Sequence, residues 1–208
     1  MTERFVERSL RAFSDDLASA AAVPGGGSAA AYAGALGAAL TAMVGRIAER
    51  KEKSEGTSAL IAEADNLRAD FLRLVDDDSA AFAQVSEAMK LPKSTDEEKK
   101  ARKERLQSAL LAASRVPLEV AKTSRRLLDL CERAVATAPS ATVSDIGVGA
   151  LMGEAALSGA ALNVMINLAS ITDAAQVKAL SEDLDGAVDG AEAQRKRITD
   201  FVESRIAR

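Results

Sequence analysis

Two aspartates stand at positions where a purely structural helix favours apolar or capping residues. Asp78 lies in LVDDDSAAFAQV, three residues after Val75 and four before Phe82, so helical spacing places its carboxylate on an apolar stripe. Asp145 opens SDIGVGALMGEAALSGAALNVMINL, the most apolar stretch of the chain. Each is a candidate site residue with a stated structural alternative. For Asp78 the alternative is a buried ion pair or helix cap, and for Asp145 it is interaction with a helix N-terminus.

Two asparagines follow Asp145 in the same apolar stretch. Asn163 comes 18 residues after it, about five helical turns, so the two side chains face the same way. A rise of about 1.5 Å per residue nevertheless separates them by roughly 27 Å. They therefore face two parts of a long ligand or two copies of a site across a dimer. Asn163 and Asn167 are one turn apart, and their amides need hydrogen-bond partners from protein or ligand.

A glycine-rich loop precedes the first long apolar segment. It reads Pro24, Gly25, Gly26, Gly27 and Ser28. The loop lacks the Lys-Ser/Thr pair of a P-loop and the spacing of a dinucleotide-binding fingerprint. It predicts a tight turn into a helix, where free backbone N–H groups are able to hold an anion.

The elements that must position these residues are predicted to be helices. Aromatic residues make up 3% of the 208 residues and Trp is absent, so the core must consist of Ala, Leu, Val and Ile. Apolar spacing predicts helices over residues 5–17, 28–53, 57–89, 96–137, 144–170 and from 173 to the C-terminus. No strand-like alternation or domain boundary is visible. We therefore expect residues 1–208 to form one all-α domain, an up-and-down multi-helix bundle with long central helices.

Several helix ends have recognisable signals. Ser28, Ser144 and Thr172 are the expected N-caps of three helices, and Thr95 with Glu98 forms a predicted capping box. A kink or break is expected at Pro117.

The second predicted helix carries a stripe of small residues along one face, namely Ala30, Gly34, Ala38, Thr41 and Gly45. Such a stripe lets two helix backbones approach closely, which suits a central helix. Small-residue apolar surface of this kind exceeds what six helices bury among themselves. We therefore expect at least a dimer.

Composition excludes several kinds of chemistry. The chain has no His and one Cys, so it offers no internal disulfide, no zinc site of the usual Cys/His kind and no Ser–His or Cys–His nucleophile. Acid–base catalysis must rest on Asp, Glu, Lys, Tyr or the backbone. No metal site is expected, and Cys131, on an apolar stripe, is predicted to be a buried structural thiol.

Charge and hydropathy indicate a cytoplasmic protein. The net charge is −4 and both signs are mixed along the chain, so the sequence shows no basic patch for binding nucleic acid or an anionic membrane. The uncharged segment between Asp16 and Arg46 is rich in weakly hydrophobic Ala and Gly and is broken by PGGG, so it is not expected to span a membrane. The charged start MTERFVERSLRAF does not resemble a signal peptide.

Taken together, these motifs resemble a known family. PGGGSAAAYAGALGAALTAMV, VDDDSAAF, LPKSTDEEK with VPL after it, and SDIGVGALMGEAALSGAALNVMINL occur in the order typical of the cyclodeaminase domain of formiminotransferase-cyclodeaminase and of bacterial methenyltetrahydrofolate cyclohydrolases built on that domain. The resemblance covers nearly the whole chain from about Phe13. It carries over onto Pro24, Gly25, Gly26, Gly27, Ser28, Asp78, Leu91, Pro92, Lys93, Pro117, Ser144, Asp145, Asn163 and Asn167.

The resemblance implies an all-helical homodimer that acts on the one-carbon bridge of tetrahydrofolate without a prosthetic group. One reaction hydrates 5,10-methenyltetrahydrofolate to 10-formyltetrahydrofolate. The other closes 5-formiminotetrahydrofolate to the methenyl compound with loss of ammonia. Because no formiminotransferase accompanies the domain, we favour the cyclohydrolase. The cyclodeaminase and a non-catalytic folate-binding or structural helical dimer are the alternatives.

Roles for the site residues follow from the chemistry that the resemblance implies. We assign Asp145 to stabilising the amidinium cation and Asp78 to proton transfer. The PGGGS loop, Ser144, Asn163 and Asn167 are expected to bind substrate. Lys93 is expected to meet a carboxylate of the folate tail, or else to be a solvated loop lysine.

The chain departs from the family pattern at two places. Residues 45–54 read GRIAERKEKS, with no glycine between Ala48 and Lys51 and no aromatic residue, although the pattern tends to have both there. Ala138-Pro139 stands where the pattern has Gly-Asn. Both positions bear on the shape of the folate pocket, and they motivate the non-catalytic alternative.

Overall fold

The computed structural model describes residues 4–207, and every regular element within them is a helix. The α-helices are α1 (Leu10–Leu17), α2 (Gly26–Lys51), α3 (Glu55–Lys90), α4 (Asp96–Thr137), α5 (Val143–Leu168), α6 (Ala174–Val188) and α7 (Ala191–Ile206). Two short 3-10 turns, Phe5–Glu7 and Ser140–Thr142, precede α1 and α5. The predicted all-α class with long central helices is confirmed.

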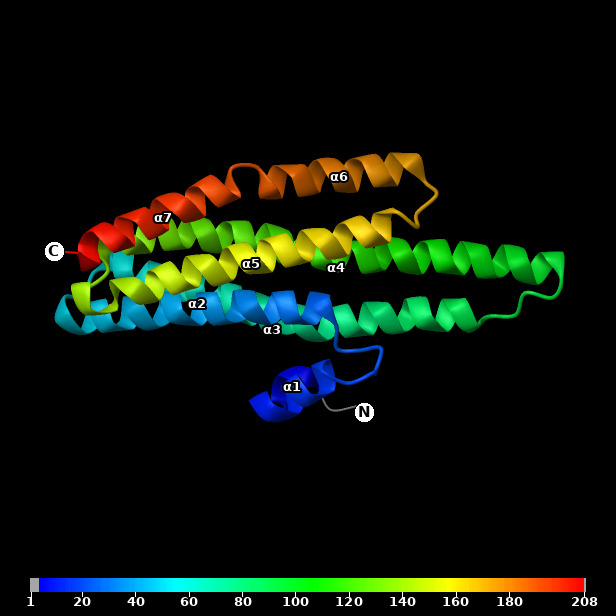
Figure 1. Cartoon of the computed structure of the whole chain (residues 1–208), viewed down its shortest axis with the longest axis horizontal. Helices are drawn as coiled ribbons and strands as arrows, with labels where there is room; N and C mark the ends of the chain where they lie inside the picture. Colours follow the sequence, from blue (N-terminus) through cyan, green and yellow to red (C-terminus); the bar gives the residue numbers. More distant parts are fainter. Residues whose placement is uncertain (1–3, 208) are drawn as a thin grey trace.

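The four long helices form an up-and-down bundle. Helix α2 packs on α3 and α5, and α4 packs on the same two helices from the other side (Figure 1). Helices α6 and α7 cover α4 and α5, while α1 lies on the opposite side of the bundle (Figure 1). Helices α3 and α4 extend beyond the start of α2, so the bundle has only two long helices at that end (Figure 1).

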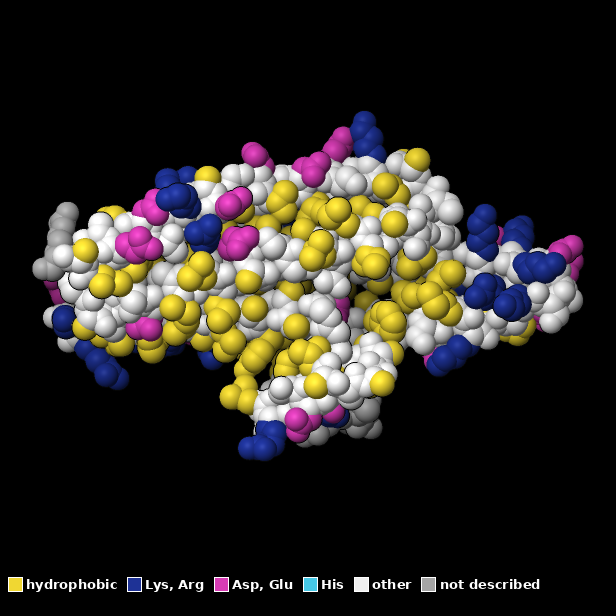
Figure 2. Space-filling model, in the orientation of Figure 1, with side chains coloured by type: hydrophobic (Ala, Val, Ile, Leu, Met, Phe, Trp, Pro, Cys, Tyr) yellow, Lys and Arg dark blue, Asp and Glu magenta, His cyan; other side chains and the backbone are white. Residues whose placement is uncertain are grey.

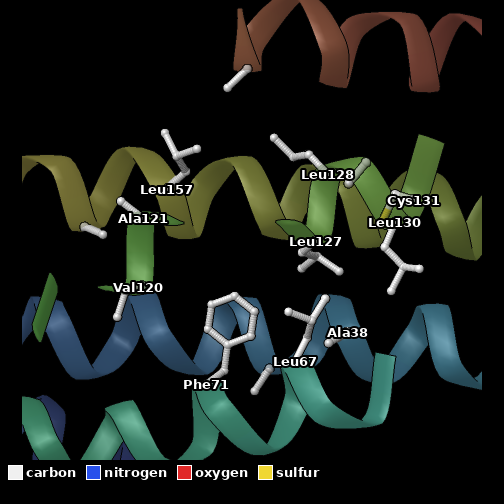
Figure 3. Close-up of a cluster of buried hydrophobic side chains, with 14 of the residues drawn as sticks. Ala38, Leu67, Phe71, Val120, Ala121, Leu127, Leu128, Leu130, Cys131 and Leu157 are labelled. Carbon is white, nitrogen blue, oxygen red and sulfur yellow. The ribbon is translucent and has the colours of Figure 1, made fainter. Parts of the chain in front are cut away.

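The core is built where the small residues of α2 let larger side chains approach its backbone. Phe71 of α3 is fully buried and points toward α2 (Figure 3). A Cβ added at Gly34 would lie 2.4 Å from Phe71 Cε1, and one added at Gly37 would lie 2.8 Å from the carbonyl oxygen of Gly149 on α5. The predicted small-residue stripe of α2 is therefore confirmed as packing surface.

Three predicted N-caps are wrong, and each has a local reason. Gly25 is the N-cap of α2, and Ser28 lies inside the helix, where its hydroxyl bonds to α3 instead. A 3-10 turn runs directly into α5, so Ser144 already lies within that helix. Asp173 rather than Thr172 caps α6, because its carboxylate accepts from two backbone N–H groups. The capping box of Thr95 and Glu98 is confirmed.

The predicted long C-terminal helix is two helices. It is interrupted at Asp189 and Gly190, and Gly190 adopts a left-handed conformation with φ of 68°. Glycine occupies that region without steric cost, so the chain turns there and continues as α7.

Of the kink or break expected at Pro117, the break is wrong, because α4 is a single helix of 42 residues that contains the proline. A helical proline removes the N–H that would bond to the carbonyl four residues earlier, here Ala113. The Asn167 Nδ2 of α5 donates to that carbonyl oxygen at 3.1 Å. The amide replaces the missing bond, so the freed carbonyl is satisfied and α4 remains one helix.

We predict that Gly34→Ala destabilises the protein by about 1–3 kcal/mol, the usual cost of overpacking a core, because the new methyl group collides with the buried Phe71 ring. Gly186→Ala is the matched control, since a Cβ there meets nothing within 4 Å and α6 gains a better helix former. Urea unfolding monitored by circular dichroism measures both. Equal stabilities for the two variants would contradict the packing role of Gly34.

Candidate functional site

A cleft opens where the N-terminus of α2 meets α3, α4 and the C-terminal half of α5. Its volume is about 310 Å³. One end is polar, with the side chains of Asp78, Asn163 and Asn167, and the other is apolar, with Phe82, Val85, Met89, Leu110 and Ile166. Figure 2 shows the hollow beside α1. The residues of the polar end come from two helices, α3 and α5, which the sequence singles out separately.

The carboxylate of Asp78 lies directly against the first turn of α2. A Cβ added at Gly27 would lie 2.1 Å from Asp78 Oδ1, so no side chain fits at that position. The hydroxyl hydrogen of Ser28 lies between two acceptors, Asp78 Oδ2 at 3.0 Å and the Val75 carbonyl oxygen at 2.9 Å. Ser79 Oγ lies 3.2 Å from the Ser28 hydroxyl. The acid is therefore locked between α3 and the start of α2.

Burial and hydrogen bonding act on Asp78 in opposite directions. Burial raises the pKa of its carboxyl group, and hydrogen bonds from the Ser28 hydroxyl and backbone N–H lower it by a smaller amount. The net effect is a raised pKa, as the sequence reasoning expects for a carboxylate on an apolar stripe. The raised pKa makes the Asp78 carboxylate a better proton acceptor than an ordinary aspartate.

The three glycines of the PGGG loop do different things. Gly27 is required by the contact with Asp78. A Cβ at Gly26 would make an ordinary contact of 3.5 Å with Asn163 Nδ2, and one at Gly25 would meet nothing within 4 Å. The position expected for a bound anion is partly taken by the protein's own Asp78 carboxylate. The loop shapes the polar end of the cleft.

Two asparagines line the cleft, and their amide oxygens remain available as acceptors. Asn163 Nδ2 donates to the Gly159 carbonyl oxygen at 2.8 Å, and Asn167 Nδ2 donates to the carbonyl freed by Pro117. Neither Oδ1 atom has a hydrogen-bond partner within residues 4–207. Both side chains are held by their nitrogens, so two acceptors are positioned for N–H groups of a ligand.

Not every predicted site residue reaches the cleft. Pro24 and Ser28 are buried behind it, and Lys93 is exposed in the loop after α3. Ser144 and Asp145 lie at the other end of α5, roughly 27 Å along the helix axis from Asn163. The single chain therefore brings together Asp78, the three glycines and the two asparagines, and leaves Asp145 apart from Asp78.

Some cleft residues were missed or misread at the sequence level. Phe82 is expected in the core but is 45% exposed, because α3 runs past the start of α2 at this level and nothing covers that face. Met89 and Ile166 were not singled out. Their helical spacing from Asp78 and Asn163 is the signal that relates them to the site. No sequence feature relates Ser79 to the site except its position next to Asp78.

The cysteine is a buried thiol, as its apolar stripe predicts. Burial raises the pKa of Cys131 to about 11, so it offers no thiolate at neutral pH. Among the described residues, no three His, Cys, Asp or Glu side chains gather in a way that could hold a metal ion.

Comparison with known proteins gives consistent matches over the chain. A family model described as Formiminotransferase-cyclodeaminase matches residues 9–186. The methenyltetrahydrofolate cyclohydrolase of Methylorubrum extorquens is 38% identical over 201 residues, which cover 95% of this chain and 97% of that protein. A formimidoyltransferase-cyclodeaminase from Gallus gallus is 41% identical over 81% of this chain but only 32% of its own length.

A solved structure also matches. The crystal structure of formiminotetrahydrofolate cyclodeaminase from Thermotoga maritima superposes with a TM-score of 0.84 at 28% sequence identity, covering 96% of this chain and 98% of that one. The fold and the sequence therefore agree on the same relatives. The chain spans about a third of the length of the Gallus gallus relative and nearly all of the two bacterial ones.

We predict that Asp78→Asn changes how stability depends on pH. The folded carboxyl has a raised pKa, so between its ordinary and raised values the folded state binds more protons than the unfolded state, and stability falls as pH rises. The variant lacks this loss. As the pH rises from acid to neutral, the free energy of unfolding of the variant should therefore increase relative to that of the wild type.

Asp77→Asn is the matched control, because that carboxylate is on the helix surface beside Arg73 and not in the cleft. Urea titrations across roughly pH 4 to 8 measure the difference. Parallel pH profiles for the wild type and Asp78→Asn would show that burial of Asp78 has no energetic consequence.

Proposed function

Because the chain belongs to the formiminotransferase-cyclodeaminase family, we propose that it hydrolyses 5,10-methenyltetrahydrofolate to 10-formyltetrahydrofolate in the cleft at the start of α2. The Methylorubrum extorquens relative of that name matches over nearly the full length of both chains. The Gallus gallus relative has a further two thirds that this chain does not match. Membership favours an enzyme of folate one-carbon metabolism over the non-catalytic alternative.

The observation that carries the proposal is a single titratable side chain, Asp78, beside two amide acceptors at one end of an otherwise apolar cleft. The methenyl carbon lies between two nitrogens in an amidinium cation, so it is already electrophilic. A nearby carboxylate stabilises that cation and is placed to accept a proton from attacking water. The raised pKa of Asp78 makes its carboxylate a stronger base than an ordinary aspartate, which suits it to take that proton.

One carboxylate is sufficient for the proton transfers of the reaction. Water oxygen bonds to the methenyl carbon while Asp78 takes one of its protons. The bond from that carbon to N5 then breaks, N5 takes the proton from Asp78, and the hydroxyl proton leaves to solvent as the formyl C=O forms. The net result is addition of one water and release of one proton, with Asp78 unchanged.

The remaining cleft residues suit the pterin end of a folate. The Oδ1 atoms of Asn163 and Asn167 are acceptors, and the amino group and ring N–H groups of an aminopyrimidinone are donors. Phe82, Met89 and Ile166 offer apolar surface to a flat ring system. A cleft of about 310 Å³ holds the ring system and leaves the tail outside. Lys93 remains our proposed contact for a tail carboxylate.

Ring closure of 5-formiminotetrahydrofolate with loss of ammonia is the second candidate. The structural match to a formiminotetrahydrofolate cyclodeaminase from Thermotoga maritima favours it. Both reactions pass through a tetrahedral carbon bonded to N5 and N10, so the same cleft and the same carboxylate serve either. Assays on the two substrates separate them.

We further propose that the protein acts as a homodimer in the cytoplasm. An apolar surface extends over the solvent-facing sides of α2 and α5, which we call the α2/α5 face (Figure 2). Its large exposed side chains are Leu36, Met43, Val148, Leu151, Leu162, Met165 and Ile166. A contiguous apolar surface of this kind marks an interaction site.

A second copy is a better occupant of this face than a lipid bilayer. Both α2 and α5 are long and apolar enough to cross a membrane, but the α2 segment is 61% buried within the fold. Glu154, bonded to Ser158, interrupts the α5 segment near its middle. A carboxylate there is costly in hydrocarbon and readily solvated or paired at a protein interface.

We predict that Leu151→Lys gives a monomer at micromolar concentration, because it places a charge in the middle of the α2/α5 face. Leu10→Lys on α1 is the control, since Leu10 is 72% exposed and does not belong to the α2/α5 face. Light scattering measures the mass of both. A wild-type monomer, or an unaffected Leu151→Lys dimer, would contradict the proposed interface.

We predict that Asp78→Asn lowers turnover of 5,10-methenyltetrahydrofolate by about 10²-fold or more, the usual scale for losing a general acid or base. Loss of the near-ultraviolet absorbance of the substrate follows the rate, and ammonia release from the formimino substrate follows the second candidate reaction. Asp77→Asn should retain wild-type rates. A folded Asp78→Asn variant with wild-type rates on both substrates would place the catalytic group elsewhere.

A further inference from the structure

The cleft of a single chain is open on one side. Ile166 at its edge is 70% exposed, and Met89 is 53% exposed. Asp78 is the one titratable side chain among the residues that line it. The open side adjoins the α2/α5 face, because Ile166 belongs to both. Whatever covers that face therefore also closes the cleft.

Helices α2 and α5 run antiparallel, and their glycine contacts set the register. Gly26 lies beside Asn163, Ala30 beside Gly159, and Gly37 beside Gly149. Following the same register, Asp145 lies at about the level of residue 44 on α2. Within one chain, the cleft is thus at one end of the α2/α5 face and Asp145 is at the other.

A symmetric dimer pairs this face with itself. The exposed stripe of α2 runs from Ala29 to Ile47, and that of α5 runs from Val148 to Ile166. A twofold axis buries both stripes most completely when it passes near their common centre, at about residue 35 of α2. If the axis is perpendicular to the helices, residue 26 of one copy lies opposite about residue 44 of the other.

Charge favours that antiparallel arrangement over a parallel one. Arg46 and Arg50 stand at the C-terminal end of the α2 stripe, and Arg50 has no ion-pair partner within the described part of the chain. An axis parallel to the helices would place these arginines beside their own copies. The perpendicular axis separates these arginines from their own copies, and it also opposes the α2 dipoles.

Asp145 is on the side of α5 that such a dimer covers. It lies three residues before Val148, so helical spacing places it on the exposed stripe. It is half-buried, and it has no hydrogen bond or ion pair within residues 4–207. The first turn of α5, where it lies, is a favourable place for a negative charge. Its carboxylate is therefore available to a ligand at the interface.

We propose that a second copy of the chain, seated antiparallel on the α2/α5 face, closes the cleft and brings Asp145 of the partner subunit to its open side. There the carboxylate faces the bound folate and neutralises the amidinium, while Asp78 of the first chain transfers the proton. Each dimer then has two composite sites. This inference rests on the proposed function and on the proposed homodimer.

The decisive experiment uses mixed dimers. Chains carrying Asp78→Asn and Asp145→Asn are given different affinity tags, co-expressed and purified as heterodimers through both tags. In a composite site, one of the two sites of each heterodimer has both wild-type aspartates, so we expect about half the wild-type rate, while either homodimer keeps about 1% or less. Rates in the heterodimer no higher than in the homodimers, or a wild-type rate for Asp145→Asn, would overturn the proposal.

A cross-linking test of the same geometry does not depend on activity. Ala29→Cys and Leu40→Cys alter half-buried positions on the same stripe of α2, and a centre near residue 35 places them opposite each other in the antiparallel dimer. A short bis-maleimide should join one chain of each kind in a mixture and join neither variant to itself. Cys131 is buried and does not interfere.

The two readouts separate the possible failures. A mixed cross-link with no turnover by the wild type on either substrate refutes the proposed function and leaves the antiparallel dimer intact. Turnover by the wild type together with self-linked Ala29→Cys chains indicates a parallel dimer and overturns the composite site. No cross-link of either kind excludes α2 from the interface, which also overturns it.

Discussion

The close approach of Asp78 to the first turn of α2 is the contact on which the site depends. It exists because Gly27 has no side chain, and Ser28 holds the carboxylate from behind. The same contact buries the acid and raises its pKa. The glycine loop is therefore neither a phosphate cradle nor only a turn. It is the surface against which a half-buried carboxylate is placed, and the packing of the bundle keeps α2 and α3 at this distance.

A second constraint links the packing of the bundle to the cleft. Pro117 frees the Ala113 carbonyl, and Asn167 satisfies it with its amide nitrogen. That hydrogen bond keeps α4 continuous and at the same time leaves the Asn167 oxygen available as an acceptor. One residue thus serves both helix integrity and ligand recognition. A proline within a helix and an asparagine on a distant apolar face are explained by each other, and neither is explained alone.

Sequence patterns predict what is local and fail where tertiary contacts decide. The helices, the capping box at Thr95 and the small-residue stripe of α2 follow from periodicity and propensity within short windows. The continuity of α4 does not, because the partner of Ala113 comes from another helix. The burial of Asp78 is visible in its spacing from Val75 and Phe82. The exposure of Phe82 is not, because it depends on where α2 begins relative to α3.

The separation of Asp78 and Asp145 shows a further limit of reading one chain. Family motifs place both aspartates among the residues of interest, but the fold places Asp78 of α3 beside Asn163 in the C-terminal half of α5 and Asp145 at the N-terminus of α5. Interaction with the helix N-terminus accounts for a negative charge at Asp145, but it does not account for the pairing of a carboxylate that has no hydrogen bond or ion pair among residues 4–207 with an uncovered apolar stripe beside it. Both features follow if the functional unit is two chains, because a twofold axis at the middle of that stripe exchanges its ends.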